Sequence, residues 1–365
     1  MDHPVGIAEQ FTPQGRVLDL REYGRGNVND TFLVMVTGAA QPHFILQRLN
    51  PHVFRRPGLV MRNLRIVGDH VARRLAPAPA SHGRRFEVPR VLLTRDGRDH
   101  VIDPGGSFWR ALSFIDAAET FDTIQDAGHA REVGYALGRF HTLLSDLPPE
   151  HLSDTLPGFH ITPGYLAHYD EVLERQGPRN SPEVQYCLRF VAQRRVLAPV
   201  LEDAKAQGKL RPRPMHGDPK VNNVMLDPAT GGAVALVDLD TVKPGLVHYD
   251  IGDALRSGCN PQGEETDAWE TVRFEPDLCR AMLQGYLPVA RDFLTETDYV
   301  YLYDAIRLIA FELGLRFFTD YLAGNVYFKA RRPEHNLARA LVQFKLTESI
   351  ESQAAAIGAI SRDLR

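Results

Sequence analysis

The chain has 365 residues, of which 44% are hydrophobic and 24% are charged, and its formal net charge is −4 at pH 7. These proportions are those of a globular protein with one large or two smaller domains, and no basic stripe suggests nucleic acid or an anionic membrane as a partner. No stretch approaches the roughly 20 apolar residues that span a bilayer, and the N-terminus lacks a signal-peptide pattern, so we expect a cytoplasmic protein without membrane contact. The three cysteines are far apart and suggest reduced, small apolar residues.

Residues 1–116 have the pattern of a small β domain. Alternation of apolar and polar residues predicts five strands, and a helical pattern follows the third strand. The predicted strands are RVLDLREY, DTFLVMVT, FILQRL, FEVPRVLLT and SFWRALSFI, and the predicted helix is GLVMRNLRIVGDHVARRL.

Residues 117–365 are predicted to be mostly helical. Apolar residues at helical spacing form one stripe in the segment AREVGYALGRFHTLLSDL, namely Val133, Leu137, Phe140 and Leu144. A long aromatic-rich segment, YVYLYDAIRLIAFELGLRFFTDYLAG, contains a suitable helix-ending glycine, Gly324. The predicted fold class is therefore α+β, with a small antiparallel N-terminal lobe and a larger helical C-terminal lobe.

The stretch MHGDPKVNNVMLD, residues 215–227, combines turn-forming residues with groups that suit phosphoryl transfer. A carboxylate at Asp218 would accept the proton of an attacking hydroxyl, and Lys220 would neutralise charge on the transferred group. Asn223 and Asp238 offer the hard oxygen ligands that Mg²⁺ prefers. The turn DPATGG between them would let a hairpin bring both to one point.

Two simpler interpretations stand beside this one. Any single Asp-Pro or Asn-Asn pair is more often a plain turn. His216 and Asp218 also have the types of a metal-ligand pair, but no further His or Cys follows at the spacing of a zinc site.

The pattern His-x-Asp-x-Lys-x-x-Asn, followed by an apolar strand and Asp, resembles the catalytic loop of protein kinases. It is more similar to that of the aminoglycoside and choline kinase-like phosphotransferases, which share the kinase fold. Together with VDLDTVKPG, YDIGD, LRFFTDYLAGNVYF and RPEHNLARALVQFKL, it resembles the N-acetylhexosamine 1-kinases, which use ATP and Mg²⁺ to phosphorylate the anomeric hydroxyl of N-acetylglucosamine or N-acetylgalactosamine.

The resemblance implies a bilobal protein kinase-like fold and roles for individual residues. Asp218 would be the general base, and Asn223 and Asp238 the magnesium ligands. Asp240 would support that metal or bind a second one, while His216 and Asp250 would hold the loop by hydrogen bonds. The implied substrate is a small sugar and the implied cofactors are ATP and Mg²⁺.

A kinase-like N-terminal lobe covers the nucleotide phosphates with a glycine-rich hairpin. The segment EYGRGNVNDTFLV has the right position, although its third glycine is replaced by Asn29. We expect the adenine to lie against the backbone of residues 112–115. The predicted nucleotide contacts are Gly24, Gly26, Asn27, Asn29, Gln47, Leu112 and Ile115.

Gln47 stands where such a lobe carries its phosphate-binding lysine, and the next helix offers no glutamate to pair with a lysine. The N-acetylhexosamine 1-kinases are similar at this strand position, so Gln47 is compatible with activity as a neutral phosphate donor. The substitution also leaves open a nucleotide-binding pseudokinase.

For the acceptor, Arg316 and Tyr327 match the Arg and Tyr of the sugar pocket in the resembled family. Read from the residues alone, Arg316 could equally form a surface ion pair with Glu312. The nearby aromatics Tyr303, Phe311, Phe317 and Phe318 are more typical of a core than of a sugar platform. Another hexose, homoserine or an aminoglycoside remains an alternative acceptor.

Overall fold

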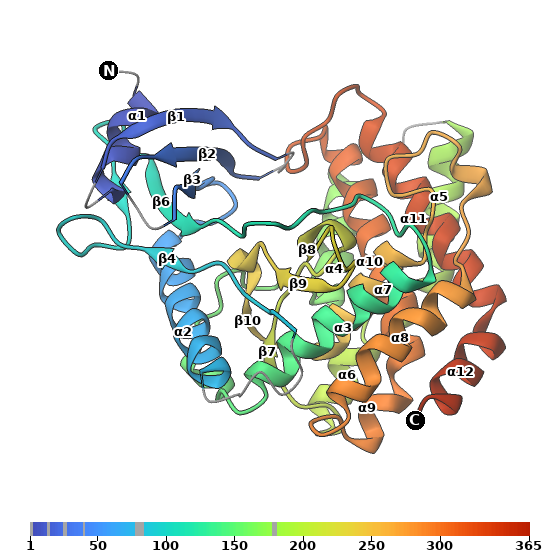
Figure 1. Cartoon of the computed structure of the whole chain (residues 1–365). Coiled ribbons are helices and arrows are strands. Elements are labelled where there is room, and N and C mark those ends of the chain that lie inside the picture. Colours follow the sequence, from blue (N-terminus) through green and yellow to red (C-terminus); the bar gives the residue numbers. More distant parts are fainter. Residues whose placement is uncertain (1–2, 13–14, 25–27, 39–40, 77–83, 177–180) are drawn as a thin grey trace.

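The computed structural model describes residues 3–12, 15–24, 28–38, 41–76, 84–176 and 181–365. Figure 1 shows the strands of the N-terminal part gathered at one end of the molecule, and helices with a few short strands among them make up the rest. The predicted architecture, an antiparallel sheet followed by a larger helical part, is confirmed.

Within the described ranges, the sheet of the N-terminal part has six strands instead of the five expected. The order is β1-β2-β3-β6-β4, β5 also pairs with β6, and every pairing is antiparallel. The strands are β1 Val17–Glu22, β2 Asp30–Val36, β3 His43–Arg48, β4 Val91–Leu92, β5 Val101–Ile102 and β6 Phe108–Ser113. Besides the expected helix, a short helix α1, His3–Ala8, and a 3₁₀ turn η1, Glu9–Phe11, precede the sheet. Two-residue strands and a six-residue helix are too short for a periodic signal, so the sequence pattern missed β5 and α1.

The two faces of the sheet have different neighbours. One face packs under α1 and η1 and forms a small core of Ile7, Phe11, Val34, Phe44, Leu46 and Trp109. Because side chains alternate along a strand, Thr31, Gln47 and Arg110 point to the opposite face. On that face, Leu112 joins the main core that continues into the helical part.

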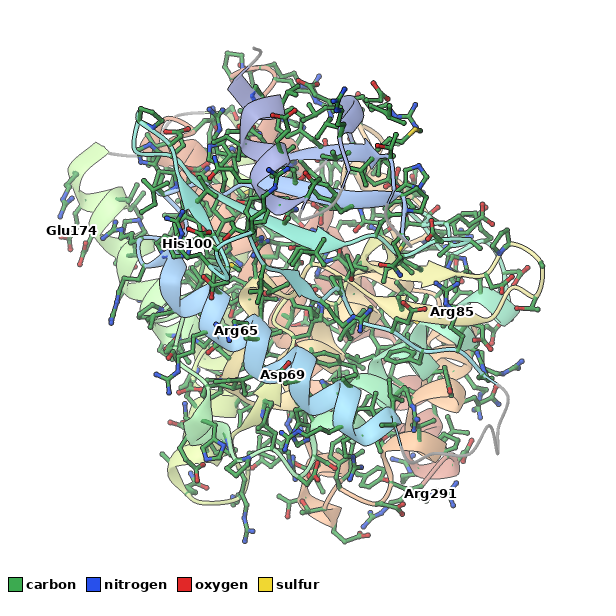
Figure 2. The ribbon with its side chains drawn as sticks, turned by 60° about the vertical axis from the view of Figure 1, so that its left-hand side comes forward. Arg65, Asp69, Arg85, His100, Glu174 and Arg291 are labelled. Atoms are coloured by element: carbon green, nitrogen blue, oxygen red, sulfur yellow. The ribbon has the colours of Figure 1, made fainter. Side chains whose placement is uncertain are left out.

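Helix α2, Pro57–Leu75, is fastened to the C-terminal part by a buried asparagine. Its apolar side, Val60, Met61, Leu64, Val67 and Val71, belongs to the main core. Asn63 donates to the carbonyl oxygens of Ser153 and Val242, both at 2.8 Å, and its Oδ1 accepts from Ser153 N at 2.9 Å. Figure 2 shows Arg65 and Asp69 along this helix, where both are exposed. The helix is thus held from one side and solvated on the other.

The first long helix of the C-terminal part, α3, Ala127–Leu144, buries the predicted stripe of Val133, Leu137, Phe140 and Leu144. It packs directly on α8, Pro276–Ala290. A Cβ at Gly134 would lie 1.9 Å from Met282 O, and one at Gly285 would lie 1.9 Å from Arg131 O. These glycines therefore allow the two backbones to touch.

The predicted aromatic helix is α10, Leu302–Ala323, and it packs on α11, His335–Ser352. It ends at Gly324, whose φ of 95° is left-handed, as expected for a C-cap. Phe311, Phe317 and Phe318 are buried and Tyr303 packs against the main core, which confirms their predicted core role. The remaining helices are α4 Thr162–Gln176, α5 Pro182–Arg194, α6 Val200–Ala206, α7 Val247–Gly258, α9 Glu296–Val300 and α12 Ala354–Asp363. None of the helices in the described ranges is both long and apolar enough to cross a bilayer.

Candidate active site

The polar stretch 215–227 lies between short strands, as its turn-forming residues suggest. Strand β7, Arg213–Met215, pairs with β10, Lys243–Gly245, and the loop then passes through a 3₁₀ turn η4, Val221–Asn223. Strands β8, Val224–Leu226, and β9, Ala233–Leu236, form the expected hairpin. Because Val237 N donates to Asn223 O at 2.9 Å, the hairpin brings Asn223 and Asp238 to the same end, as predicted.

Asp250 of α7 holds the backbone of the loop. This buried carboxylate accepts from His216 N at 2.6 Å, from Gly217 N at 2.7 Å and from the ring of His141 at 2.8 Å. Burial alone would raise the pKa of Asp250, but the hydrogen bonds from His141 and from the loop backbone outweigh it and keep the pKa below the usual value. Asp250 is therefore an anionic anchor for the loop backbone.

His216 fixes the next part of the loop. Burial lowers its pKa, so the ring is neutral, with Nε2 donating to Val237 O at 2.9 Å and Nδ1 accepting from Asp218 N at 3.2 Å. Gly217 has φ 91°, and a Cβ there would lie 2.9 Å from Thr241. Only glycine allows the chain to turn this close to Thr241 and present Asp218.

Asp218, Lys220 and Asn223 form one hydrogen-bonded group. Lys220 Nζ donates to Asp218 Oδ2 at 2.8 Å, and Asn223 Nδ2 donates to Asp218 O at 2.7 Å. Both charged side chains are about one-third exposed, at 30% for Asp218 and 36% for Lys220. Burial alone would lower the pKa of Lys220, but Asp218 and Asp238 outweigh it and raise it, so Lys220 is charged.

Asp238 completes this group from the returning strand. Its φ of 64° is left-handed, a conformation that Asn and Asp tolerate better than most side chains. The side chain is open to solvent, yet protein atoms crowd it. Lost hydration and the carboxylates of Asp240 and Asp218 raise the pKa of Asp238 to about 7.

A divalent cation would relieve this crowding of carboxylates, so the donor set fits Mg²⁺. Asn223 uses its amide nitrogen within the loop, which leaves Oδ1 as its metal-binding atom. In the part of the chain that the structure describes, no three His, Cys, Asp or Glu side chains gather as a metal-binding group. A cation held by Asn223 Oδ1 and Asp238 would take its other ligands from phosphate or water, as Mg²⁺ commonly does.

Asp240 lies in the 3₁₀ turn η5, Leu239–Thr241, and contacts the N-terminal sheet. Its Oδ1 lies 2.5 Å from Arg110 Nη2, and its Oδ2 accepts from Asn29 Nδ2 at 2.8 Å. Both of its oxygens thus face donors from the N-terminal part, one on β6 and one in the bend before β2. Its metal role stays a prediction, while its link to the sheet is a structural fact.

The predicted nucleotide contacts fall into three groups. Gly26 and Asn27 lie outside the described residues, while Gly24, with φ 77°, lies in a bend just after β1. Leu112 lies in the sheet between Ile45 and Val91, and Ile115 is buried just beyond the end of β6. Their contacts with a nucleotide stay predictions.

The third group is Asn29 and Gln47, and both are held by protein partners. The side chain of Asn29 donates to Asp240, and its Oδ1 accepts a hydrogen bond from the backbone N–H of Asn50 at 3.0 Å. Gln47 Nε2 donates to Thr31 Oγ1 at 3.1 Å, and its Oε1 accepts from Arg110.

Arg316 of α10 is largely buried rather than on the helix surface. Its guanidinium lies over the rings of Phe159, Tyr165 and Phe328 at 5.1, 4.9 and 5.5 Å. The ion pair with Glu312 exists, at 4.0 Å, but Glu312 is itself buried. Burial alone would lower the pKa of Arg316, but neighbouring acidic groups, Asp218 among them, outweigh it and raise it.

Tyr327, the other predicted acceptor residue, is 55% exposed. It lies in the wall of an open pocket of about 510 Å³ formed by residues 325–333. Its ring lies 4.8 Å from the ring of Phe328, which in turn lies 5.5 Å from the guanidinium of Arg316, so the two predicted residues lie in one region.

Sequence reasoning missed a buried bridge between α10 and the loop. His160, with the unusual φ of 63°, contacts Glu312 Oε1 at 2.9 Å and Gly217 O at 2.8 Å. Burial would lower the pKa of His160, but Glu312 outweighs it and raises the pKa. A histidine between turns gives no pattern in the sequence, and only the fold brings it to Gly217.

Comparison with known proteins agrees with the fold described above. The solved structure of a microcompartment-associated aminopropanol kinase is 16% identical, with a TM-score of 0.62 over 97% of this chain and 98% of that chain. An aminoglycoside phosphotransferase from Alicyclobacillus acidocaldarius is 14% identical, with a TM-score of 0.58 over 99% and 94%. An amicoumacin kinase, solved with AMP-PNP and Ca²⁺, is 15% identical, with a TM-score of 0.54 over 92% and 88%. These likenesses show the predicted kinase-like fold.

A family model described as "Phosphotransferase enzyme family" matches residues 19–289. Because that match spans well over half of the sequence, the chain belongs to the phosphotransferase enzyme family.

Proposed function

We propose that this chain is an ATP- and Mg²⁺-dependent kinase that converts an N-acetylhexosamine to its sugar 1-phosphate. Residues 1–116 would cover the nucleotide, and residues 117–365 would carry the catalytic loop and the acceptor site. The assembly of Asp218, Lys220, Asn223 and Asp238 at one end of a hairpin supports phosphoryl transfer. The family match supports a phosphotransferase, and the resemblance of the loop and of the segment around Arg316 supports the sugar.

In the proposed reaction the anomeric oxygen attacks the γ-phosphorus of ATP. The new O–P bond forms, the bond to the leaving ADP breaks, and the hydroxyl proton passes to Asp218. Oδ1 is the atom available for this proton because Oδ2 is paired with Lys220 at 2.8 Å. The chain contributes mainly by positioning the reactants and by placing positive charge at Lys220.

Asn223 Oδ1 and the carboxylate of Asp238 would hold the divalent cation. When bound, the cation neutralises charge on the nucleotide phosphates. The protein prepares for it by crowding carboxylates, which raises the pKa of Asp238 to about 7.

One observation carries the choice of acceptor: the guanidinium of Arg316 is largely buried, and its charge interacts with that of the proposed base, Asp218. A fixed positive charge in this part of the site disfavours acceptors that carry an ammonium group. It favours a neutral acceptor whose carbonyl or hydroxyl oxygens accept hydrogen bonds, and an N-acetyl sugar has both. The aromatic rings around Arg316 keep its side chain in place.

Replacing Arg316 with methionine is therefore expected to raise the KM for the sugar about 10-fold or more, with little change in ATP affinity. Steady-state kinetics with the sugar varied at saturating ATP measures the effect. Arg307→Met is the matched control, because Arg307 lies on the same helix but pairs with Asp304. Equal effects of the two substitutions on the sugar KM would contradict the assignment of Arg316.

Phosphorus NMR of the products tests the function directly. N-acetylglucosamine, ATP and Mg²⁺ are expected to yield ADP and a phosphate resonance coupled to the anomeric proton. The methyl glycoside, which lacks a free anomeric hydroxyl, is expected to yield no product. Phosphorylation of that glycoside, or at another sugar position, would refute a 1-kinase.

A wider set of acceptors separates the alternatives. ADP release with another hexose, homoserine or an aminoglycoside, but not with the N-acetyl sugar, would identify a different kinase of the same fold. Magnesium-dependent ATP binding without ADP release on any acceptor would favour a pseudokinase, the reading that Gln47 supports.

A further inference from the structure

Gln47, where a lysine is expected, forms part of a polar row across three neighbouring strands. It pairs in register with Thr31 on β2 and with Arg110 on β6. Gln47 Nε2 donates to Thr31 Oγ1 at 3.1 Å, and Gln47 Oε1 accepts from Arg110 Nε at 3.0 Å and Nη2 at 2.6 Å. The glutamine thus orients an arginine on the next strand.

Arg110 is an unusual residue for the middle of a sheet. Its side chain is 1% exposed, and its charge is balanced by Asp240, which is 2% exposed, at 2.5 Å. Buried arginines need partners for all their donors, since unpaired buried donors are costly. Among the described residues, however, Arg110 Nη1 has no hydrogen-bond partner although it is fully buried.

The position of this spare donor points to a ligand. Asp240 is two residues from Asp238, and the charge of Arg110 acts on Asp238 as well. The guanidinium therefore lies at the boundary between the sheet and the proposed metal site, where the phosphates of a nucleotide would lie. Guanidinium groups suit phosphate oxygens because several donors lie in one plane.

We propose that Arg110 is the phosphate-binding cation of the N-terminal lobe, oriented by Gln47 and Asp240, and that it replaces the lysine missing from β3. The positive charge would then lie on β6 instead of the neighbouring β3, on the same face of the sheet. Gln47 then positions this cation, which also removes the main reason to regard the chain as a pseudokinase. This inference rests on the proposed use of ATP.

Binding measurements test the inference without turnover. Arg110→Met is expected to weaken the binding of ATP and ADP, with Mg²⁺ present, about 10- to 100-fold, as for loss of a charge-assisted hydrogen bond. The affinity for adenosine, which has no phosphates, is expected to stay the same. Titration calorimetry measures all three ligands on each variant.

Three further variants sharpen the test. In Gln47→Lys/Arg110→Met a cation returns to the usual strand, so ATP affinity is expected to recover most of the loss. Arg48→Met removes a charge from the other face of β3, where Arg48 pairs with exposed Asp30, and is expected to leave ATP affinity unchanged. Asp240→Asn/Arg110→Met avoids an unpaired buried carboxylate, and serves if the single variant does not fold.

Unchanged ATP affinity in Arg110→Met, or in Asp240→Asn/Arg110→Met if the single variant does not fold, would overturn the inference. Equal losses for ATP and adenosine would also overturn it, since they would mean that Arg110 only joins the two lobes. The proposed function fails separately, if the unaltered protein binds no ATP with Mg²⁺.

Discussion

Asp218→Asn is expected to lower turnover by about 100- to 10,000-fold, the usual worth of a positioned general base. The amide cannot take the proton of the attacking hydroxyl. ATP affinity is expected to stay within about threefold, because Lys220 and the proposed metal ligands remain. Initial rates of ADP release and calorimetric ATP binding measure the two effects.

Asp227→Asn is the matched control for this substitution. Asp227 lies in the β8–β9 turn, where its Oδ1 accepts from Ala229 N at 2.7 Å, and asparagine can make the same turn contact. The turnover rate of Asp227→Asn is expected to equal that of the unaltered protein. A near-normal rate in Asp218→Asn would refute the assignment of the base, whatever the acceptor.

Asp238→Asn is expected to remove activity and to weaken Mg²⁺ binding, measured in the presence of a non-hydrolysable ATP analogue, by 100-fold or more. The metal-free protein is expected to be at least as heat-stable as before. A neutral side chain relieves the repulsion that raises the pKa of Asp238 to about 7. Asparagine also accepts the left-handed φ of 64° at this position, so the backbone is not strained.

This pattern, lower activity with equal or higher stability, separates a functional carboxylate from a structural one. Thermal unfolding in the presence of a chelator measures the stability. A lower melting temperature together with normal Mg²⁺ binding would show that Asp238 supports the fold and does not bind the metal.

The sequence predicted the parts of the site that lie close together along the chain. Asp218, Lys220 and Asn223 follow one another within one loop, and the turn DPATGG made the return to Asp238 foreseeable. Alternation predicted the longer strands, and helical spacing predicted the stripe of α3, because those patterns repeat over enough residues to be read.

Local sequence patterns could not predict contacts between segments that are far apart along the chain. Arg110 contacts Gln47 and Asp240 from another strand. The number of residues between Arg110 and either partner forms no recognisable sequence pattern. The missing lysine was visible in the sequence, but its replacement required the register of β3 and β6. His160 likewise reaches Gly217 only because α10 presents Glu312 beside it.

The three hydrogen bonds of Asn63 have a consequence for regulation. In many protein kinases the helix after the third strand swings to switch activity on and off. Here that movement would break contacts to Ser153 and Val242, each worth about 1 kcal/mol, so the swung-out state would hold about one molecule in a hundred or fewer. We therefore expect α2 to hold one position against the C-terminal part.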